Sequence, residues 1–290
     1  MKVVISRKGF DSSAGWMPSP ILEDGRLVPL PIPSKSDNVR MDEVDVAVDD
    51  LDGMLRDLSG RKHPLTGSTR VHLDPLLVPP PHAEVGWRPS LGQTGSAASH
   101  LEKQGVGRGD LFLFFGWFRR VEQTVSGWAW LRGAPDIHVL FGWLEVDDWA
   151  GMHRDRVHSV HKYPWLASHP HAGPTYTDSR NGIYVGSTRS RILGPNFLGG
   201  GRFPAWHPAL QLTCGGKNNK RSLWDLPGFF LPQGRPPLTY HANPNRWTAK
   251  GDRVRLKTVG RGQEFVIDSQ HYPALESWAV STIQMGTVGL

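Results

Sequence analysis

The sequence has little cysteine and no long apolar run. Cys214 is the only cysteine among 290 residues, so the chain can form neither an intrachain disulfide nor a cysteine-based zinc site. We expect Cys214 to be a small core residue, with a reactive nucleophile as the alternative. The strongest apolar stretch, residues 111–118, is far shorter than the ~20 residues of a membrane-spanning helix. Because the start of the chain also lacks an apolar signal region, we expect a cytoplasmic protein without a membrane segment.

Charge is unevenly distributed along the chain. The 33 Lys and Arg residues exceed the 27 Asp and Glu residues, and the formal net charge is +6. Residues 1–60 are net acidic, whereas residues 217–261 carry ten basic residues against only Asp225 and Asp252. Clustering of this kind, more than the overall charge, predicts a polyanionic partner such as a nucleic acid or a nucleotide.

The apolar pattern predicts an α+β fold with few helices and many long loops. The 33 glycines and 24 prolines favour turns and loops over long regular elements. Period-two or continuous apolar runs predict strands at residues 1–9, 107–119, 137–149, 181–187, 209–213, 253–259 and 263–268. Helical spacing predicts helices at residues 41–58, 94–105 and 273–284.

Two of the predicted strands are long, apolar and similar to each other. Each is interrupted by a glycine, Gly116 or Gly142, directly before a tryptophan, which favours neighbouring strands of one curved sheet. We find no internal repeat and no linker. We therefore expect a single domain over residues 1–290, built on a curved or barrel-like mixed β core.

Polar residues gather where the opening strand ends. Arg7 and Lys8 close the strand, and Asp11, Ser12 and Ser13 follow in a turn-rich segment. Arginine offers forked donors, and glycines near these residues let a ligand approach the backbone closely, which suits a phosphate or a ribose. We expect the two cations and the serines to hold such a group and Asp11 to orient or activate the substrate. An ordinary charged turn is the alternative.

Two histidine-containing pairs offer polar groups two residues apart. They are His72 with Asp74, and His169 with His171. In an extended chain, such residues project from the same face, so each pair could offer two ligands to one ion or one substrate group. Metal binding, hydrogen bonding and proton transfer to a substrate, and anchoring of loops all remain open. The sequence leaves the presence of a metal and the identity of any cofactor undetermined.

Two late segments offer groups that suit a base and a ribose. Tyr240 and His241 provide flat rings for stacking, with Arg246 close by in sequence. Gln263 can bond two groups on a base edge at once. Glu264 lies among cations, where a carboxylate stays ionised, which suits a ribose contact better than a general base.

The predicted strand at residues 253–259 alternates between basic and apolar side chains. Arg253, Arg255 and Lys257 would share one face at intervals of ~6.6 Å, twice the rise per residue of a strand. A phosphate backbone could lie along this row, adding affinity without reading sequence. A solvated strand face is the alternative.

Several of these segments together resemble the nucleotide modification associated domain 3 family. The resemblance covers nearly the whole chain and rests on SRKGFDSSAGWMPSPI, HLDP, GQTGSAASHL with GDLFLFFGWFR, HPHA with GIYVGS, LQLT to LWDLPGFF, YHANPNRW and RGQEFVID. It implies association with bacterial or phage systems that modify nucleic-acid bases, and it brings no catalytic residues with it. The pair GDLFLFF and VLFGWLEV also looks like the strand pair of PUA-like base-reading modules such as EVE domains.

These observations support three hypotheses. The first is an enzyme that modifies a nucleotide or nucleic-acid base by group transfer or hydrolysis, with candidate catalytic residues Asp11, His72, His169, His171 and Glu264. The second is a non-catalytic reader that grips an extruded base in a tryptophan-lined pocket. The third is an enzyme similar to ADP-ribosyltransferases, in which Arg7, residues 187–190 and Glu264 act together. The first requires the opening strand and the late segments to share one hollow.

Overall fold

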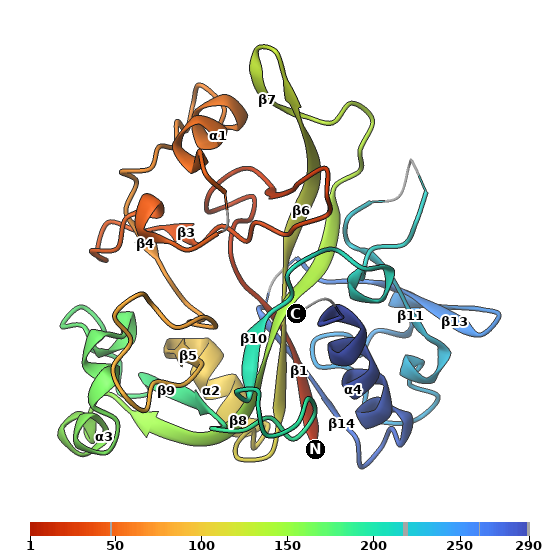
Figure 1. Ribbon diagram of the computed structural model, residues 1–290. Helices are drawn as coiled ribbons and strands as arrows, with labels where there is room; N and C mark the ends of the chain where they lie inside the picture. The colour runs from red at the N-terminus through yellow and green to blue at the C-terminus, as the bar shows by residue number, and fades with distance from the viewer. Residues whose placement is uncertain (47, 217–219, 261, 289–290) are drawn as a thin grey trace.

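Two long antiparallel strands run through the centre of the molecule. In the computed structural model, which describes residues 1–46, 48–216, 220–260 and 262–288, these are β6 (Leu111–Thr124) and β8 (Ile137–Gly151) (Figure 1). Their register shifts between Phe114 and Phe115, beside Gly116 on one strand and Gly142 on the other. A bulge of this kind bends a strand pair. The prediction that these two segments are neighbours in one curved sheet is therefore confirmed.

The central sheet is mixed and open. Its strands follow the order β14-β1-β6-β8-β9-β5, in which β1 (Lys2–Arg7) is parallel to β6 and antiparallel to β14 (Glu264–Asp268). The path continues with β9 (Gly182–Gly186) and β5 (Ser90–Gln93), while β2 (Ser19–Ile21) and β7 (Gly127–Trp130) pair with β6 and β10 (Gly200–Arg202) pairs with β8.

The sheet order overturns one expectation. Among the described residues, β14 forms a ladder only with β1, and β5 forms one only with β9, apart from an isolated bridge between Ser90 and Leu76. The described strands form no closed barrel, so that version of the prediction is wrong. The α+β class and the mixed β core are confirmed.

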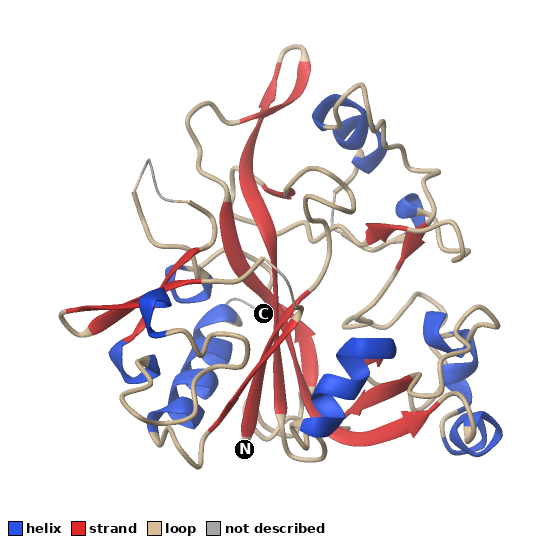
Figure 2. Cartoon of the chain, turned by 180° about the vertical axis from the view of Figure 1, so that it is seen from behind, coloured by secondary structure: helices blue, strands red, loops and turns tan. Residues whose placement is uncertain are grey.

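Two smaller sheets and four α-helices flank the central sheet in the described part of the chain (Figure 2). The sheets are β3 (Ile32–Pro33) with β4 (Val71–His72), and β11 (Leu223–Pro227), β13 (Arg253–Lys257) and β12 (Trp247–Lys250) in that spatial order. The α-helices are α1 (Leu51–Leu58), α2 (Gly95–Lys103), α3 (Arg156–Lys162) and α4 (Ala274–Gly286). Short 3₁₀ helices are η1 (Met41–Glu43), η2 (Pro164–Ser168), η3 (Pro170–Ala172), η4 (Pro208–Leu210), η5 (Gly228–Phe230) and η6 (Pro244–Arg246). None of the described helices has the length and apolarity that crossing a membrane requires.

The helix expected over residues 41–58 is only partly present. A single 3₁₀ turn, η1, ends at Glu43, the backbone of Val44 is extended, and α1 begins only after Asp50. Valines and aspartates alternate between these points, and both residue types have low helix propensity. Asp50 instead caps α1, because its side chain accepts a hydrogen bond from the Gly53 N–H.

Most of the other predicted elements are found. Helices α2 and α4 occupy the expected segments, as do strands β1, β9, β13 and β14. The strand expected at residues 209–213 is wrong, because Pro208 starts a 3₁₀ turn and only isolated bridges follow at Gln211 and Thr213. Lys217 and Arg261, which contribute to the predicted basic segment, lie outside the described residues.

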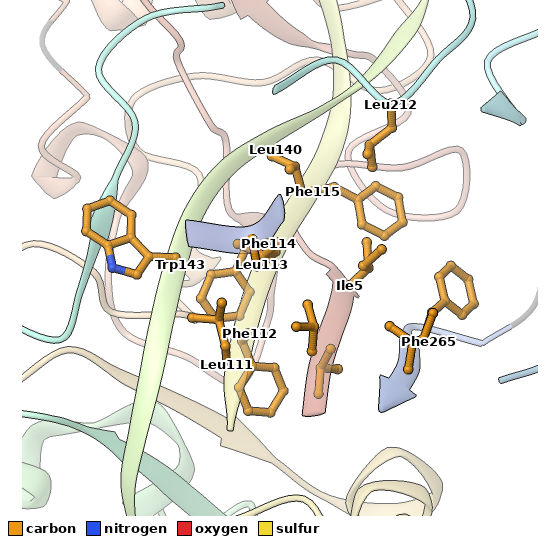
Figure 3. Close-up of a cluster of buried hydrophobic side chains, with 14 of the residues drawn as sticks. Ile5, Leu111, Phe112, Leu113, Phe114, Phe115, Leu140, Trp143, Leu212 and Phe265 are labelled. Atoms are coloured by element: carbon orange, nitrogen blue, oxygen red, sulfur yellow. The ribbon is translucent and has the colours of Figure 1, made fainter. Parts of the chain in front are cut away.

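The main core lies where β1, β6 and β14 run side by side. Figure 3 shows Ile5, Phe115 and Phe265 on these strands, all fully buried. The rings of Phe115 and Phe265 are 6.2 Å apart between centroids. Burying an aliphatic or aromatic side chain contributes about 1.5–3 kcal/mol. This packing fixes the adjoining ends of β1 and β14, which carry Arg7, Lys8 and Glu264.

Candidate functional site

A cavity of about 640 Å³ opens where the ends of β1, β5 and β14 meet. Its volume lies within the ~300–1,000 Å³ range of small-ligand sites. Segments from across the chain supply its polar lining, which comprises Arg7, Lys8, Asp11, Ser13, His72, Asp74, Gln93, Thr94, Ser96, His100, His171, Tyr176, Tyr240, Gln263 and Glu264. The opening strand, the histidine-bearing loops and the late segments thus line one hollow.

Sheet topology explains this convergence. Because β1 and β14 are antiparallel, Ser6 at the end of β1 pairs with Glu264 at the start of β14. The curvature of the sheet also brings β5, at the far end of the strand order, back toward β14. A side-chain hydrogen bond of 2.6 Å from Gln93 Nε2 to Glu264 Oε1 joins the two. The ends of β5 and β14 are thus joined by a side-chain hydrogen bond, whereas in a closed barrel backbone hydrogen bonds would join the two strands.

Glu264 is the most buried acid on the cavity wall. Its side chain is 1% exposed, and its Oε1 atom also accepts a hydrogen bond of 3.0 Å from Lys8 Nζ. Among the described residues, its Oε2 atom has no hydrogen-bond partner. Buried carboxylate oxygens normally have donors. This buried oxygen therefore lacks the donor that such an atom normally has.

Arg7 is mostly committed to the protein itself. Its guanidinium donates hydrogen bonds to the carbonyls of Gly260 and Val259, at 3.0 and 3.2 Å, and only its Nε atom lacks a partner among the described residues. Burial lowers the pKa of Arg7, while the nearby Asp11 raises it. Arg7 lines the cavity, but the two guanidinium donors that we expected to bind a phosphate donate to backbone carbonyls instead.

Asp11 organises its own turn. Its Oδ1 atom accepts hydrogen bonds from the Ser13 N–H, the Ser13 hydroxyl and the Ala14 N–H, at 2.6–2.8 Å. Burial alone would raise the Asp11 pKa, but these hydrogen bonds and the charge of Arg7 outweigh burial and lower it. An acid held ionised in this way is a weak proton acceptor. Ser12 is exposed and is not among the lining residues.

His72 and Asp74 lie on the wall formed by β4 and the loop after it. The Nδ1 atom of His72 is 3.3 Å from Asp37 Oδ2 and 3.0 Å from the Tyr176 hydroxyl. Its Nε2 atom lies 4.0 Å from Asp74 Oδ2. The other oxygen of Asp74 accepts a hydrogen bond of 2.7 Å from the Gly92 N–H.

His171 faces the same wall from η3. Its Nδ1 atom is 2.8 Å from Asn181 Oδ1, and the Tyr176 ring stacks on it at 4.2 Å between centroids. Burial lowers the His171 pKa, and the opposing effects of Asp74 and Asn181 do not restore it. A Cβ atom at residue 92 would lie 2.2 Å from the His171 Cδ2 atom, so Gly92 is needed for this close packing.

His169 lies behind the wall rather than on it. It is buried, its Nδ1 atom accepts a hydrogen bond from the His171 N–H, and its Nε2 atom is 3.6 Å from Asp74 Oδ1. Burial lowers its pKa to about 3, so the ring is neutral. The structure thus gives His169 a position supporting Asp74 rather than direct contact with the cavity.

The other predicted binding residues lie away from the cavity. His241 is fully buried, with Nδ1 bound to the Thr239 carbonyl and Nε2 accepting from the Val259 N–H, so the expected stacking on a base is wrong for this ring. Arg246 donates to the Lys257 carbonyl.

Strand β13 has the predicted alternation, with its apolar residues buried. Of its cations, Arg253 is bound to Asp225 at 3.1 Å, whereas Arg255 is partly exposed and Lys257 is exposed. None of the three lines the cavity.

The arrangement typical of ADP-ribosyltransferases is not assembled. Ser190 is buried and donates to Glu145 at 2.6 Å, and Arg191 contacts the same carboxylate at 3.2 Å. Residues 187–190 are absent from the cavity lining that contains Arg7 and Glu264. The spatial requirement of that hypothesis is therefore not met.

Five polar lining residues are not among the candidates drawn from the sequence. Gln93, Thr94 and Ser96 come from the junction of β5 and α2, and His100 from the next turn of the helix. Their signal was present, because polar residues directly before a predicted helix are typical of an anion-binding helix start. Tyr176 lies in a loop, and nothing local distinguishes it.

The family can now be assigned. Residues 2–268 match the family described as nucleotide modification associated domain 3. The chain belongs to this family. No curated protein and no solved structure matches the chain. The matched range includes every residue that lines the cavity, so the whole candidate site lies within the family domain.

Proposed function

We propose that this protein is an enzyme that modifies a nucleotide or a nucleic-acid base held in the polar cavity. The observation that carries the proposal is the Oε2 atom of Glu264, a buried carboxylate oxygen without a partner in the described part of the chain, on the wall of a ligand-sized hollow. A ribose hydroxyl or an exocyclic amino group would supply the missing donor after a small side-chain rearrangement that uncovers this oxygen.

The rest of the cavity suits the other parts of a nucleotide. The first-turn N–H groups of α2 lack intrahelical acceptors, Thr94 makes no side-chain cap, and Ser96 and Ala97 line the cavity, which together suit a phosphate. Tyr240 is 50% exposed, with its ring 4.7 Å from that of His100, and offers a stacking face for a base.

The lining favours an enzyme over a reader with a tryptophan pocket. No tryptophan is among the described residues that line the cavity, although the chain contains twelve. The wall instead carries histidines, carboxylates and a lysine, which are groups that transfer protons or hold ions. Membership of a nucleotide modification family supports the same class of substrate.

Titration of the full chain with nucleotides, single-stranded nucleic acid and duplex tests the proposal. We expect a nucleotide at about 100 times its Kd to stabilise the protein by ~2.7 kcal/mol, which raises the Tm by several degrees. Glu264→Gln should weaken binding by about 10- to 100-fold, because it loses a charged hydrogen bond of ~1.5–3 kcal/mol. Glu102→Gln, at an exposed position of α2, is the matched control and should bind normally.

Turnover is measured on the same samples. Incubation with the bound nucleotide or oligonucleotide, followed by mass spectrometry, should reveal a product that Glu264→Gln forms more slowly. If no nucleotide or nucleic acid shifts the Tm, the proposal fails. Binding without any product would support the reader hypothesis instead.

A further inference from the structure

Three potential metal ligands converge on one wall of the cavity. One ligand atom from each of His72, Asp74 and His171 lies within 4.8 Å of the other two. Two come from the loop around β4 and the third from η3, about a hundred residues later. We propose that these three side chains bind one divalent transition-metal ion.

The hydrogen bonds of His72 direct its free lone pair toward the cluster. The His72 Nδ1 atom lies 3.3 Å from Asp37 Oδ2, which as a carboxylate can only accept, and 3.0 Å from the Tyr176 hydroxyl, which can accept or donate. A proton on Nδ1 suits both contacts. The Nε2 atom then has the lone pair and lies 4.0 Å from Asp74 Oδ2. A carboxylate behind the imidazole is the arrangement that orients metal-binding histidines in proteins.

The hydrogen bonds of His171 lead to the same assignment. The Asn181 Nδ2 atom donates to the His171 carbonyl at 2.7 Å, which identifies the Asn181 Oδ1 atom as the acceptor facing the ring at 2.8 Å. The His171 Nδ1 atom therefore carries the proton, and Nε2 has the lone pair. Both histidines thus offer the same ring atom to the cluster, each held from behind by an oxygen.

A hydrogen bond holds one carboxylate oxygen of Asp74, as is usual for a carboxylate that binds a metal. Its Oδ1 atom accepts from the Gly92 N–H and faces His169 Nε2 at 3.6 Å. Because His169 Nδ1 accepts from a backbone N–H, its Nε2 atom carries the proton, but at 3.6 Å from Asp74 Oδ1 it makes no hydrogen bond with that oxygen. The hydrogen bond from the Gly92 N–H fixes one carboxylate oxygen, and Oδ2 lies on the side of His72.

The cluster therefore places two nitrogen lone pairs and a carboxylate oxygen together without a proton between them. Such groups repel one another unless a cation or a proton lies among them. Tetrahedral ligands at ~2.1 Å from a metal are about 3.4 Å apart. The most distant pair would approach by up to ~1.4 Å, which side-chain rotation can supply.

The ligand set indicates the class of ion and the type of site. Two imidazoles and one carboxylate suit Zn²⁺ or Fe²⁺ rather than Mg²⁺ or Ca²⁺, which prefer all-oxygen sites. Three protein ligands leave at least one coordination position open, as in catalytic rather than structural sites. All three ligands line the cavity, so the open position faces the space where a substrate would lie. The inference does not depend on nucleotide binding.

Metal binding by the full chain without nucleotide tests the inference. After treatment with a chelator and dialysis, the protein is titrated with Co²⁺ and followed by visible absorption, and Zn²⁺ is then added as a competitor. Elemental analysis measures the ratio of metal to protein. We expect one ion per chain, displaced by Zn²⁺, and a rise in Tm on binding.

Variants locate the ion. His72→Gln, Asp74→Asn and His171→Gln should each weaken Co²⁺ binding by more than the ~10- to 100-fold loss typical of an outer partner, and Asp37→Asn by about that amount. His100→Gln removes a histidine from the same cavity outside the cluster and should bind Co²⁺ normally. Circular dichroism verifies that each variant is folded, and Asp37→Asn provides a test that alters no ligand.

Two results would overturn the inference. One is a folded wild-type protein that takes up no Co²⁺ or Zn²⁺ at millimolar concentration, in which case a proton occupies the cluster. The other is uptake that is unchanged in all the ligand variants, which would assign it to surface histidines. Either result would leave the nucleotide proposal standing.

Discussion

The polar cavity and the cationic sheet β11-β13-β12 use similar residues in opposite ways. In the cavity, Lys8 is 10% exposed and bound to a buried glutamate. On the sheet, Lys257 is exposed and Arg253 contacts a partly exposed Asp225. Burial makes each charge in the cavity dependent on its partner, whereas water screens the charges on the sheet. Residue type alone therefore does not tell which cation has a specific role.

The largest contrast is expected for one substitution made in both regions. Lys8→Met removes the cation that pairs with the buried Glu264 carboxylate. We expect it to lower the unfolding free energy by about 3–5 kcal/mol. Lys257→Met, on the exposed strand face, should change stability by less than ~0.5 kcal/mol. Urea denaturation measures both. Adding Glu264→Gln to Lys8→Met should recover part of the loss, and equal effects at the two lysines would remove the distinction between the regions.

A second test concerns the segment that joins the two regions. His241 accepts from the Val259 N–H, at the point where β13 leads toward the cavity wall, and burial lowers its pKa to about 4. Between pH 6.5 and 4 the unfolded chain binds a proton at this histidine and the folded chain does not. Stability therefore falls as the pH drops through this window, by on the order of 3 kcal/mol.

Comparison with a variant isolates this contribution. His241→Gln lacks the titrating ring, so its unfolding free energy should depend less steeply on pH between 6.5 and 4. The buried His138, whose pKa burial also lowers, is present in both proteins, so its effect cancels in the difference. Parallel pH profiles for the two proteins would show that His241 is not held neutral.

The smallest effect is expected from Arg255, which is partly exposed, and Lys257, which is exposed, on β13. If nucleic acid contacts them, the double variant Arg255→Gln, Lys257→Gln should reduce the slope of log K against log salt by about 2 for a duplex, since each phosphate contact contributes ~0.9. Affinity for a free mononucleotide should not change. Arg253→Gln is the matched control, because Asp225 already neutralises that charge. An unchanged slope would assign β13 to a solvated surface.

Local patterns predicted the strands well and the long helix poorly. Period-two alternation in β13 and the apolar runs of β6 and β8 depend on neighbouring residues only, so they are visible in the sequence. The helix expected over residues 41–58 forms only over Leu51–Leu58, because the valines and aspartates before it have low helix propensity although their hydrophobic spacing is helical. The open sheet could not be foreseen, since strand order depends on contacts between distant segments.

The sequence identified many of the cavity residues but not their hydrogen bonds. Lys8, His72, Asp74 and Glu264 were selected by residue type and spacing, and the structure places all of them on one wall or another of the cavity. That Arg7 uses its forked donors on carbonyls, and that Asp37 and Asn181 lie behind the histidines, depends on tertiary packing. These hydrogen-bond partners determine which donors and lone pairs remain available in the cavity, and no local sequence pattern identifies them.

Strand β1 occupies a position that affects how the protein is made. It pairs with β6 on one side and with β14 on the other, although β14 is synthesised more than 250 residues later. Until that segment leaves the ribosome, β1 presents an open edge of unpaired N–H and carbonyl groups to other chains. The polar cavity is therefore completed only in the last stage of translation, and shortened chains that stop before β14 would be prone to aggregate.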